Sequence, residues 1–208
     1  MNVAAEMRAG LAGNEMEETA VQPAAISPGM IASVGLQDDL VAEFRWIRGH
    51  ADIWRWFADP HLFDATIKAL ADPFLKDGVT VVVGVESRGF LLAGAVAQQL
   101  EAGVVPIRKR GAIFPGSWSS KTTAPDYRER SIELLLQREV LSDADRVLIV
   151  DDWVETGSQM LTAIDLIEET GSSVVGVAVI VADSPSDAVR RLPRFHSIVP
   201  ADKLGSAS

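Results

Sequence analysis

The 208-residue sequence contains no cysteine, which excludes disulfide bonds, thiolate catalysis and thiolate metal sites. It also lacks an apolar run long enough to cross a membrane, because the run from Val79 to Val85 has only the length of a strand. The N-terminus has no basic start followed by an apolar block, so no secretory signal is visible. We therefore expect a cytoplasmic protein that does not associate with a membrane.

Basic residues are outnumbered, and the formal net charge is −10. Non-specific nucleic-acid binding needs a basic face, so we expect no nucleic-acid partner. The cations nevertheless cluster, which allows a local site for a small anionic substrate: Arg108, Lys109 and Arg110 are consecutive, with Arg88, Lys121, Arg128 and Arg130 nearby in the sequence. The sequence has neither a G-x-G-x-x-G fingerprint nor a Walker loop, which removes the two commonest nucleotide sites of α/β proteins.

Strand-like and helix-like segments alternate along most of the chain. This alternation predicts an α/β protein with a mostly parallel, twisted sheet that is flanked by helices. The expected strands are residues 79–85, 104–107, 132–136, 147–150 and 174–181, and the expected helices between them are residues 89–100 and 161–170.

The N-terminal region has a different composition. Residues 1–37 show no sustained apolar period and are expected to be a tail that is either disordered or derived from cloning. We expect a single domain over residues 38–208, beginning with a helix whose apolar positions are Leu40, Val41, Phe44 and Ile47. Residues 53–57 are expected to be irregular or a strand, and a second helix is expected around residues 63–70.

The segment from Arg146 to Gln159 carries the strongest chemical signal. An apolar strand ends in Asp151 and Asp152, and a turn with Gly157 then opens a helix. The backbone N–H groups of such a turn and the helix dipole favour a phosphate. The two carboxylates can hold ribose hydroxyls or a hydrated Mg²⁺. Together these features indicate a site for a phosphorylated ribose.

This segment resembles the phosphoribosyl diphosphate signature of the type I phosphoribosyltransferases, in which apolar residues, two acids and a small-residue Thr-Gly loop follow one another. A second loop, Gly84 to Phe90, resembles the pyrophosphate loop of the adenine branch of that family through Ser87-Arg88-Gly89-Phe90. The resemblance implies the type I phosphoribosyltransferase fold. It also implies a small hood segment at about residues 38–60 and a flexible lid at about residues 112–131.

The resemblance further implies a purine salvage transferase. Such an enzyme makes a nucleoside monophosphate and pyrophosphate from phosphoribosyl diphosphate and a free base, most simply AMP from adenine. Its expected cofactor is Mg²⁺, held mainly by substrate and water with no direct protein ligand, and its expected assembly is a homodimer.

The same resemblance assigns roles to residues. The catalytic set is Asp126, Asp151 and Asp152, and the base-binding set is Ile53 and Trp153. The expected phosphoribosyl diphosphate-binding residues are Ser87, Arg88, Lys109, Tyr127, Asp151, Asp152, Glu155, Thr156, Gly157, Ser158 and Gln159.

The chain departs from the family pattern at several of these positions. Glu155 and Gln159 replace an alanine and a threonine of the usual phosphate loop, and Asp126 replaces the lid glutamate. The hood reads His50-Ala51-Asp52-Ile53, without the usual arginine and aromatic residue. Two alternatives therefore stay open: a transferase for another heterocyclic base, or a non-catalytic protein that senses phosphoribosyl diphosphate or a nucleotide.

Overall fold

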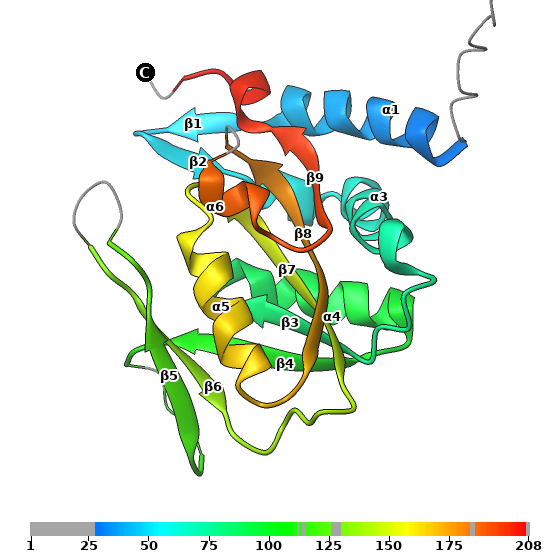
Figure 1. Ribbon diagram of the computed structural model, residues 1–208. Coiled ribbons are helices and arrows are strands. Elements are labelled where there is room, and N and C mark those ends of the chain that lie inside the picture. The colour runs from blue at the N-terminus through cyan, green and yellow to red at the C-terminus, as the bar shows by residue number, and fades with distance from the viewer. Residues whose placement is uncertain (1–27, 112, 114, 126–129, 184–185, 207–208) are drawn as a thin grey trace, which may run out of the picture.

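The computed structural model describes residues 28–111, 113, 115–125, 130–183 and 186–206. Its main sheet is built from β3 (Val81–Val85), β4 (Gly103–Lys109), β5 (Trp118–Thr122), β6 (Glu133–Gln137), β7 (Arg146–Val154), β8 (Ser173–Ala182) and β9 (Phe195–Pro200). The seven strands lie in the order β5-β6-β4-β3-β7-β8-β9 (Figure 1). β4, β3, β7, β8 and β9 are parallel, whereas β6 runs antiparallel to both β4 and β5. The expected α/β fold with a mostly parallel sheet is confirmed.

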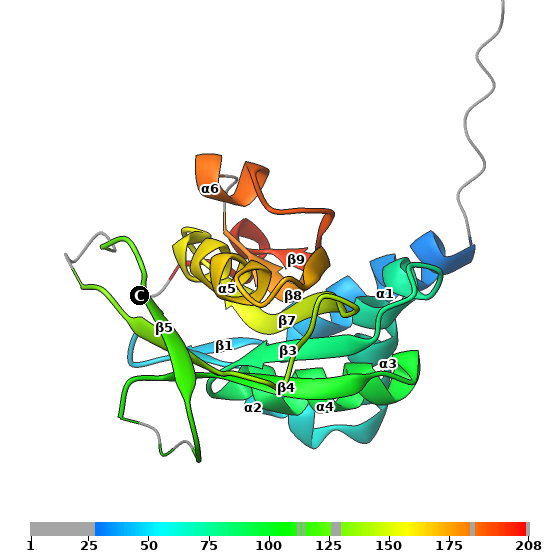
Figure 2. The same ribbon diagram turned by 60° about the horizontal axis from the view of Figure 1, so that its bottom comes forward.

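Helices cover both faces of this sheet. They are α1 (Pro28–Glu43), α2 (Trp54–Ala58), α3 (Pro60–Ala71), α4 (Arg88–Leu100), α5 (Ser158–Glu168) and α6 (Asp187–Arg190), with short 3₁₀ turns at Asp72–Phe74 and Ala201–Leu204. Figure 2 shows α5 on one side of the sheet and α2, α3 and α4 on the other. None of the described helices combines the length and the apolar character that crossing a membrane requires.

Two apolar clusters, one on each face, form the core. Strand side chains alternate between the faces, so Val82 packs with the cluster of α1, α3 and α4, and Val83 packs with the cluster of α5. All five residues of β3 are buried. A strand that is covered on both faces reads as a continuous apolar run, which is why residues 79–85 were recognisable in the sequence.

The segment before β3 differs from the expectation. α1 begins at Pro28, before the expected start of the folded part near Asp38, and Ile47 belongs to a strand. This strand, β1 (Arg45–Ile47), forms an antiparallel hairpin with β2 (His50–Asp52). The hairpin and α2 occupy the region expected to be the hood. Residues 1–27 lie outside the described part of the chain, and the domain boundaries remain a prediction.

The prediction of an irregular or strand segment at residues 53–57 was wrong, because residues 54–58 form α2. Aromatic side chains favour strands, but here tertiary packing decides. Trp56 is completely buried, and its Nε1–H donates to the Leu40 carbonyl at 2.9 Å. Asp59 then caps α3 by accepting hydrogen bonds from the backbone N–H groups of His61 and Leu62.

A close approach between β3 and α4 positions the loop that joins them. A Cβ atom on Gly84 would lie 2.3 Å from the carbonyl oxygen of Gly89, so only glycine allows this contact. The start of α4 is thereby held against the carboxyl ends of β3 and β7. Parallel sheets of this kind bind ligands at that edge.

Candidate active site

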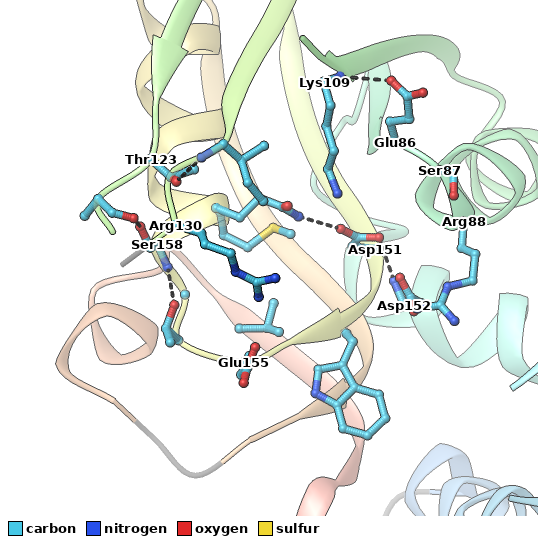
Figure 3. A pocket seen from close by; sticks show the side chains of 18 residues that line it. Glu86, Ser87, Arg88, Lys109, Thr123, Arg130, Asp151, Asp152, Glu155 and Ser158 are labelled. Carbon is cyan, nitrogen blue, oxygen red and sulfur yellow. Dashed lines mark hydrogen bonds and ion pairs between the residues drawn. The ribbon is translucent and has the colours of Figure 1, made fainter. Parts of the chain in front are cut away.

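A cavity of about 420 Å³ lies at the carboxyl ends of β3, β4 and β7 (Figure 3). It is lined by Glu86, Ser87, Arg88, Lys109, Thr123, Ala124, Arg130, Ile132, Asp151, Asp152, Trp153, Val154, Glu155, Thr156, Gly157, Ser158, Gln159 and Met160. The cavity therefore brings together four segments of the chain: the β3–α4 loop, the end of β4, the connection between β5 and β6, and the end of β7 with the turn into α5.

The acid pair belongs to β7 and is almost completely buried. Asp151 is 4% exposed and Asp152 is 7% exposed. The backbone N–H of Asp152 donates to Oδ1 of Asp151 at 2.9 Å, and the side-chain amide of Gln159 donates to Oδ2 of Asp151 at 3.2 Å. Burial, and next the charge of Asp152, raise the pKa of Asp151 well above its ordinary value.

A basic side chain lies near each of the two acids. The Nη2 atom of Arg88, at the start of α4, lies 2.7 Å from Oδ2 of Asp152. The side chain of Lys109, at the end of β4, extends toward Asp151 (Figure 3). Cations placed beside two buried carboxylates reduce their mutual repulsion and leave the cavity able to accept an anionic ligand.

Glu86 fixes the entrance to the β3–α4 loop. Its Oε2 atom accepts from the backbone N–H of Lys109 at 2.9 Å and lies 3.4 Å from Nε of Arg108. The backbone N–H of Lys109, with help from the Arg108 guanidinium, lowers the pKa of Glu86. Glu86 therefore ties the β3–α4 loop to β4, and in doing so it sets where Arg88 and Lys109 stand.

The turn between β7 and α5 is shaped by Gly157. Its φ is +83°, a left-handed conformation, and a Cβ atom there would lie 3.0 Å from the backbone nitrogen of Val189. The Oγ of Ser186 donates to the Thr156 carbonyl at 2.8 Å, which anchors the turn from the other side. α5 begins immediately afterwards, so the positive end of its dipole is directed at the cavity, where the backbone N–H of Ser158 donates to Oγ1 of Thr156 at 3.4 Å.

Aromatic side chains pack together at the end of the cavity that Trp153 lines. Trp153 packs against Phe44 and Trp46, with ring centroids 6.4 Å and 6.1 Å away. Its Nε1–H donates to Oδ1 of Asp183 at 3.2 Å, which fixes the orientation of the indole ring. A flat, apolar surface next to a phosphate and sugar site suits a heterocyclic base.

Comparison with known proteins decides the family. The family model for the phosphoribosyl transferase domain matches residues 58–196, a span that contains the β3–α4 loop, the acid pair and the β7–α5 turn. The chain belongs to the phosphoribosyltransferase family. The resemblance seen in the sequence is confirmed.

Several members of this family are similar over most of the chain. An adenine phosphoribosyltransferase of Dinoroseobacter shibae is 39% identical over 141 residues, which cover 68% of this chain and 76% of that protein. One of Frankia casuarinae is 42% identical over 129 residues, 62% of this chain and 67% of that protein.

Solved structures of family members share the fold. The adenine phosphoribosyltransferase of Rhodothermus marinus superimposes with a TM-score of 0.74 at 30% identity, covering 80% of this chain and 99% of that one. The enzyme of Giardia lamblia, solved in complex with 9-deazaadenine, gives a TM-score of 0.70 at 28% identity and covers 78% of this chain and 96% of that one.

Most of the residues expected to bind the phosphoribosyl group line the single cavity described above. The exception is Tyr127, which lies outside the described residues, as does Asp126, which was expected to be catalytic. Ile53 does not line the cavity and is completely buried, so its role in binding a base stays a prediction. Trp153 lines the cavity, and its contact with a base stays a prediction.

Sequence reasoning missed seven lining residues: Glu86, Thr123, Ala124, Arg130, Ile132, Val154 and Met160. Arg130 belongs to the group of cations noted in the sequence, but nothing there distinguished it from its neighbours. Thr123 and Ala124 lie within the expected lid, and Ile132 follows it directly. They reach the cavity because β5 and β6 pair antiparallel and the Oγ of Ser158 donates to the Ala124 carbonyl at 3.4 Å.

Within the described residues, no three histidine or acidic side chains come together as a cluster that could hold a metal ion. Arg88 and Gln159 already contact the acid pair. This arrangement fits a magnesium ion that is carried by a diphosphate and water, which is how Mg²⁺ commonly enters phosphate chemistry.

Proposed function

We propose that this chain transfers a phosphoribosyl group from phosphoribosyl diphosphate to a free purine, and that adenine is the base and AMP the product. The observation that carries the proposal is the shared cavity. In it, a buried acid pair, a helix-opening turn and the Arg88 loop line one cavity of about 420 Å³, and Arg88 lies 2.7 Å from Asp152. The relatives named adenine phosphoribosyltransferase support adenine as the base.

In this proposal each part of the cavity holds one part of the substrate. Asp151 and Asp152 accept hydrogen bonds from the ribose hydroxyls, and their negative charge stabilises the cationic character that develops at the anomeric carbon. Glu155, Thr156, Gly157 and Ser158 supply backbone N–H groups to the 5′-phosphate. Ser87, Arg88, Lys109 and Tyr127 bind the pyrophosphate, which leaves with its bonding electrons as the anomeric C–O bond breaks.

The base completes the reaction. Its ring nitrogen forms the new bond to the anomeric carbon and gives up its proton to Asp126 or to water. Proton transfer of this kind accelerates a reaction by roughly 10²–10⁴-fold. Mg²⁺, when bound with the diphosphate, would neutralise the leaving group. Preorganising the ribose between the acid pair and the turn removes the entropic cost of aligning the two reactants.

Trp153 is the specific observation that favours the second candidate, transfer to another heterocyclic base. Its indole is fixed by Asp183 and by two aromatic neighbours, so the base faces a large and inflexible ring. A bulky wall at this position selects among bases by shape. The base panel described below separates the two candidates.

We also propose that the enzyme is a cytoplasmic homodimer that acts on small molecules without nucleic-acid or membrane partners. The excess of acidic residues supports the absence of nucleic acid. The homodimer is what the resemblance to the family implies.

The proposal is tested by pyrophosphate release from phosphoribosyl diphosphate and Mg²⁺, with adenine, guanine, hypoxanthine, xanthine and uracil supplied separately. Release with adenine alone supports the proposed reaction. Release with a different base moves the function to the second candidate. Binding of the diphosphate sugar without turnover of any base points to a sensing protein.

A further inference from the structure

The side chain of Gln159 is directed at a carboxylate. Gln159 is the second residue of α5, and its Nε2 donates to Oδ2 of Asp151 at 3.2 Å. The expectation from the sequence was that Gln159 would bind the phosphoribosyl substrate directly, in the place of a threonine of the usual loop. A glutamine side chain is longer than a threonine side chain, and here it spans the distance from the start of α5 back to β7.

The carboxylate that it contacts has little freedom. Asp151 is 4% exposed, and its Oδ1 accepts from the backbone N–H of Asp152 at 2.9 Å. On the same side, the backbone of Gly89 comes so close that a Cβ atom there would lie 2.8 Å from Oδ1. Oδ1 is therefore fixed by β7 and α4, while Oδ2 is held from α5 by Gln159. The carboxylate plane is defined from two sides.

We propose that Gln159 is a positioning residue, which orients Asp151 for the ribose hydroxyls and does not bind the 5′-phosphate. The inference rests on the proposed function. The Nε2 group of Gln159 donates to Asp151, which has Asp152 beside it in the sequence, so a phosphate at the same place would lie against the acid pair. The phosphate can instead take the backbone N–H groups of residues 155–158, from the turn and the first residue of α5.

The test compares two ligands that differ in the ribose. Ribose 5-phosphate carries both the diol and the phosphate, whereas inorganic phosphate carries no diol. Their affinities are measured by calorimetry with the wild-type protein, Gln159→Met, Asp151→Asn and the double variant. Methionine keeps the length of glutamine without its donors, and Gln159→Ala serves as the second variant if methionine prevents folding. Gln99→Met, at an exposed glutamine of α4, is the matched control.

If Gln159 is a positioning residue, Gln159→Met should weaken the binding of ribose 5-phosphate about tenfold, because one hydrogen bond to a charged group is lost. The affinity of Gln159→Met for inorganic phosphate should change little. The Gln99→Met control should bind both ligands as the wild-type protein does. In the Asp151→Asn background, Gln159→Met should add no further loss, because the residue acts through Asp151. In the complete reaction with phosphoribosyl diphosphate, Gln159→Met should lower kcat by a larger factor than it changes the KM for the base.

Two results would overturn the inference about Gln159 and leave the proposed function in place. One is an equal loss of affinity for both ligands, which would place Gln159 on the phosphate. The other is a loss that adds to that of Asp151→Asn, which would show that Gln159 acts independently. If the wild-type protein binds no ribose 5-phosphate, the proposed function fails and the inference fails with it.

Discussion

Gly89 and Asp151 lie so close that a Cβ atom on the glycine would come within 2.8 Å of Oδ1 of the aspartate. This contact joins the first residues of α4 to the acid pair of β7, two segments that are far apart in the sequence. The glycine of the Arg-Gly-Phe segment is thus required by the carboxylate next to it.

The first prediction follows from that contact. Gly89→Ala should push the Asp151 carboxylate out of place and lower kcat/KM for phosphoribosyl diphosphate by at least about tenfold, comparable to the loss of one hydrogen bond to a charged group. Gly94→Ala is the matched control in the same helix, where a Cβ atom meets nothing within 4 Å. The control should keep activity and raise the free energy of unfolding by about 0.5–1 kcal/mol. Equal activity of the two variants would contradict the argument.

Arg88 provides the second prediction. Arg88→Gln removes the ion pair with Asp152 and the cation proposed for the pyrophosphate, so kcat/KM should fall by roughly 10²-fold, the effect of losing a charge-assisted contact of about 3 kcal/mol. Arg110→Gln is the control, because Arg110 pairs with Glu133 and does not line the cavity. Steady-state kinetics at varied phosphoribosyl diphosphate measures both. Similar losses of kcat/KM in the two variants would mean that the effect comes from the change in net charge and not from the position of Arg88.

The third prediction concerns Trp153. Trp153→Val removes the ring proposed to face the base, and stacking on an aromatic ring is worth about 1–3 kcal/mol, so the KM for the base should rise by about tenfold or more. The KM for phosphoribosyl diphosphate should stay nearly constant. Trp118→Val, at a half-exposed tryptophan of β5, serves as the control. A change confined to the KM for phosphoribosyl diphosphate would remove Trp153 from the base site.

The fourth prediction concerns stability and pH. Burial lowers the pKa of His196 in the folded protein, and its Nε2 lies 3.1 Å from the Ala69 carbonyl oxygen. The unfolded chain therefore binds a proton more readily at this position, and the folded protein should lose stability as the pH falls below about 6.5. His196→Gln should show a shallower loss over that range in urea unfolding. His50→Gln, in the exposed β1–β2 hairpin, should follow the wild-type curve, and a wild-type curve for His196→Gln would contradict the prediction.

The sheet could be read from the sequence because its central strands are covered on both faces. β3, residues 147–150 of β7 and residues 174–182 of β8 are continuous apolar runs, and the Gly/Ala-rich pattern of α4 follows from its close packing on the sheet. α2 could not be read, since its aromatic residues favour strands and the burial of Trp56 depends on α1. β5 was missed because its polar residues have no core periodicity, and only pairing with β6 orders them.

The site shows the same limit. Asp151 and Asp152 were expected to follow a strand, yet β7 continues through them to Val154, because Asp151 and Trp153 stay paired with Val179 and Val181 of β8. The acid pair, the turn and the Arg88 loop were recognisable as local patterns. The contact of Gln159 with Asp151 and the place of Arg130 in the cavity depend on how separate elements meet, and no local pattern encodes that.

The most direct test of the account is pyrophosphate release from phosphoribosyl diphosphate, Mg²⁺ and adenine by the wild-type protein and by the Asp151→Asn, Asp152→Asn double variant. The account predicts AMP and pyrophosphate in equal amounts from the wild-type protein, and no measurable turnover from a double variant that still unfolds cooperatively. Retained turnover in the double variant would contradict the ribose site that the acid pair is proposed to form.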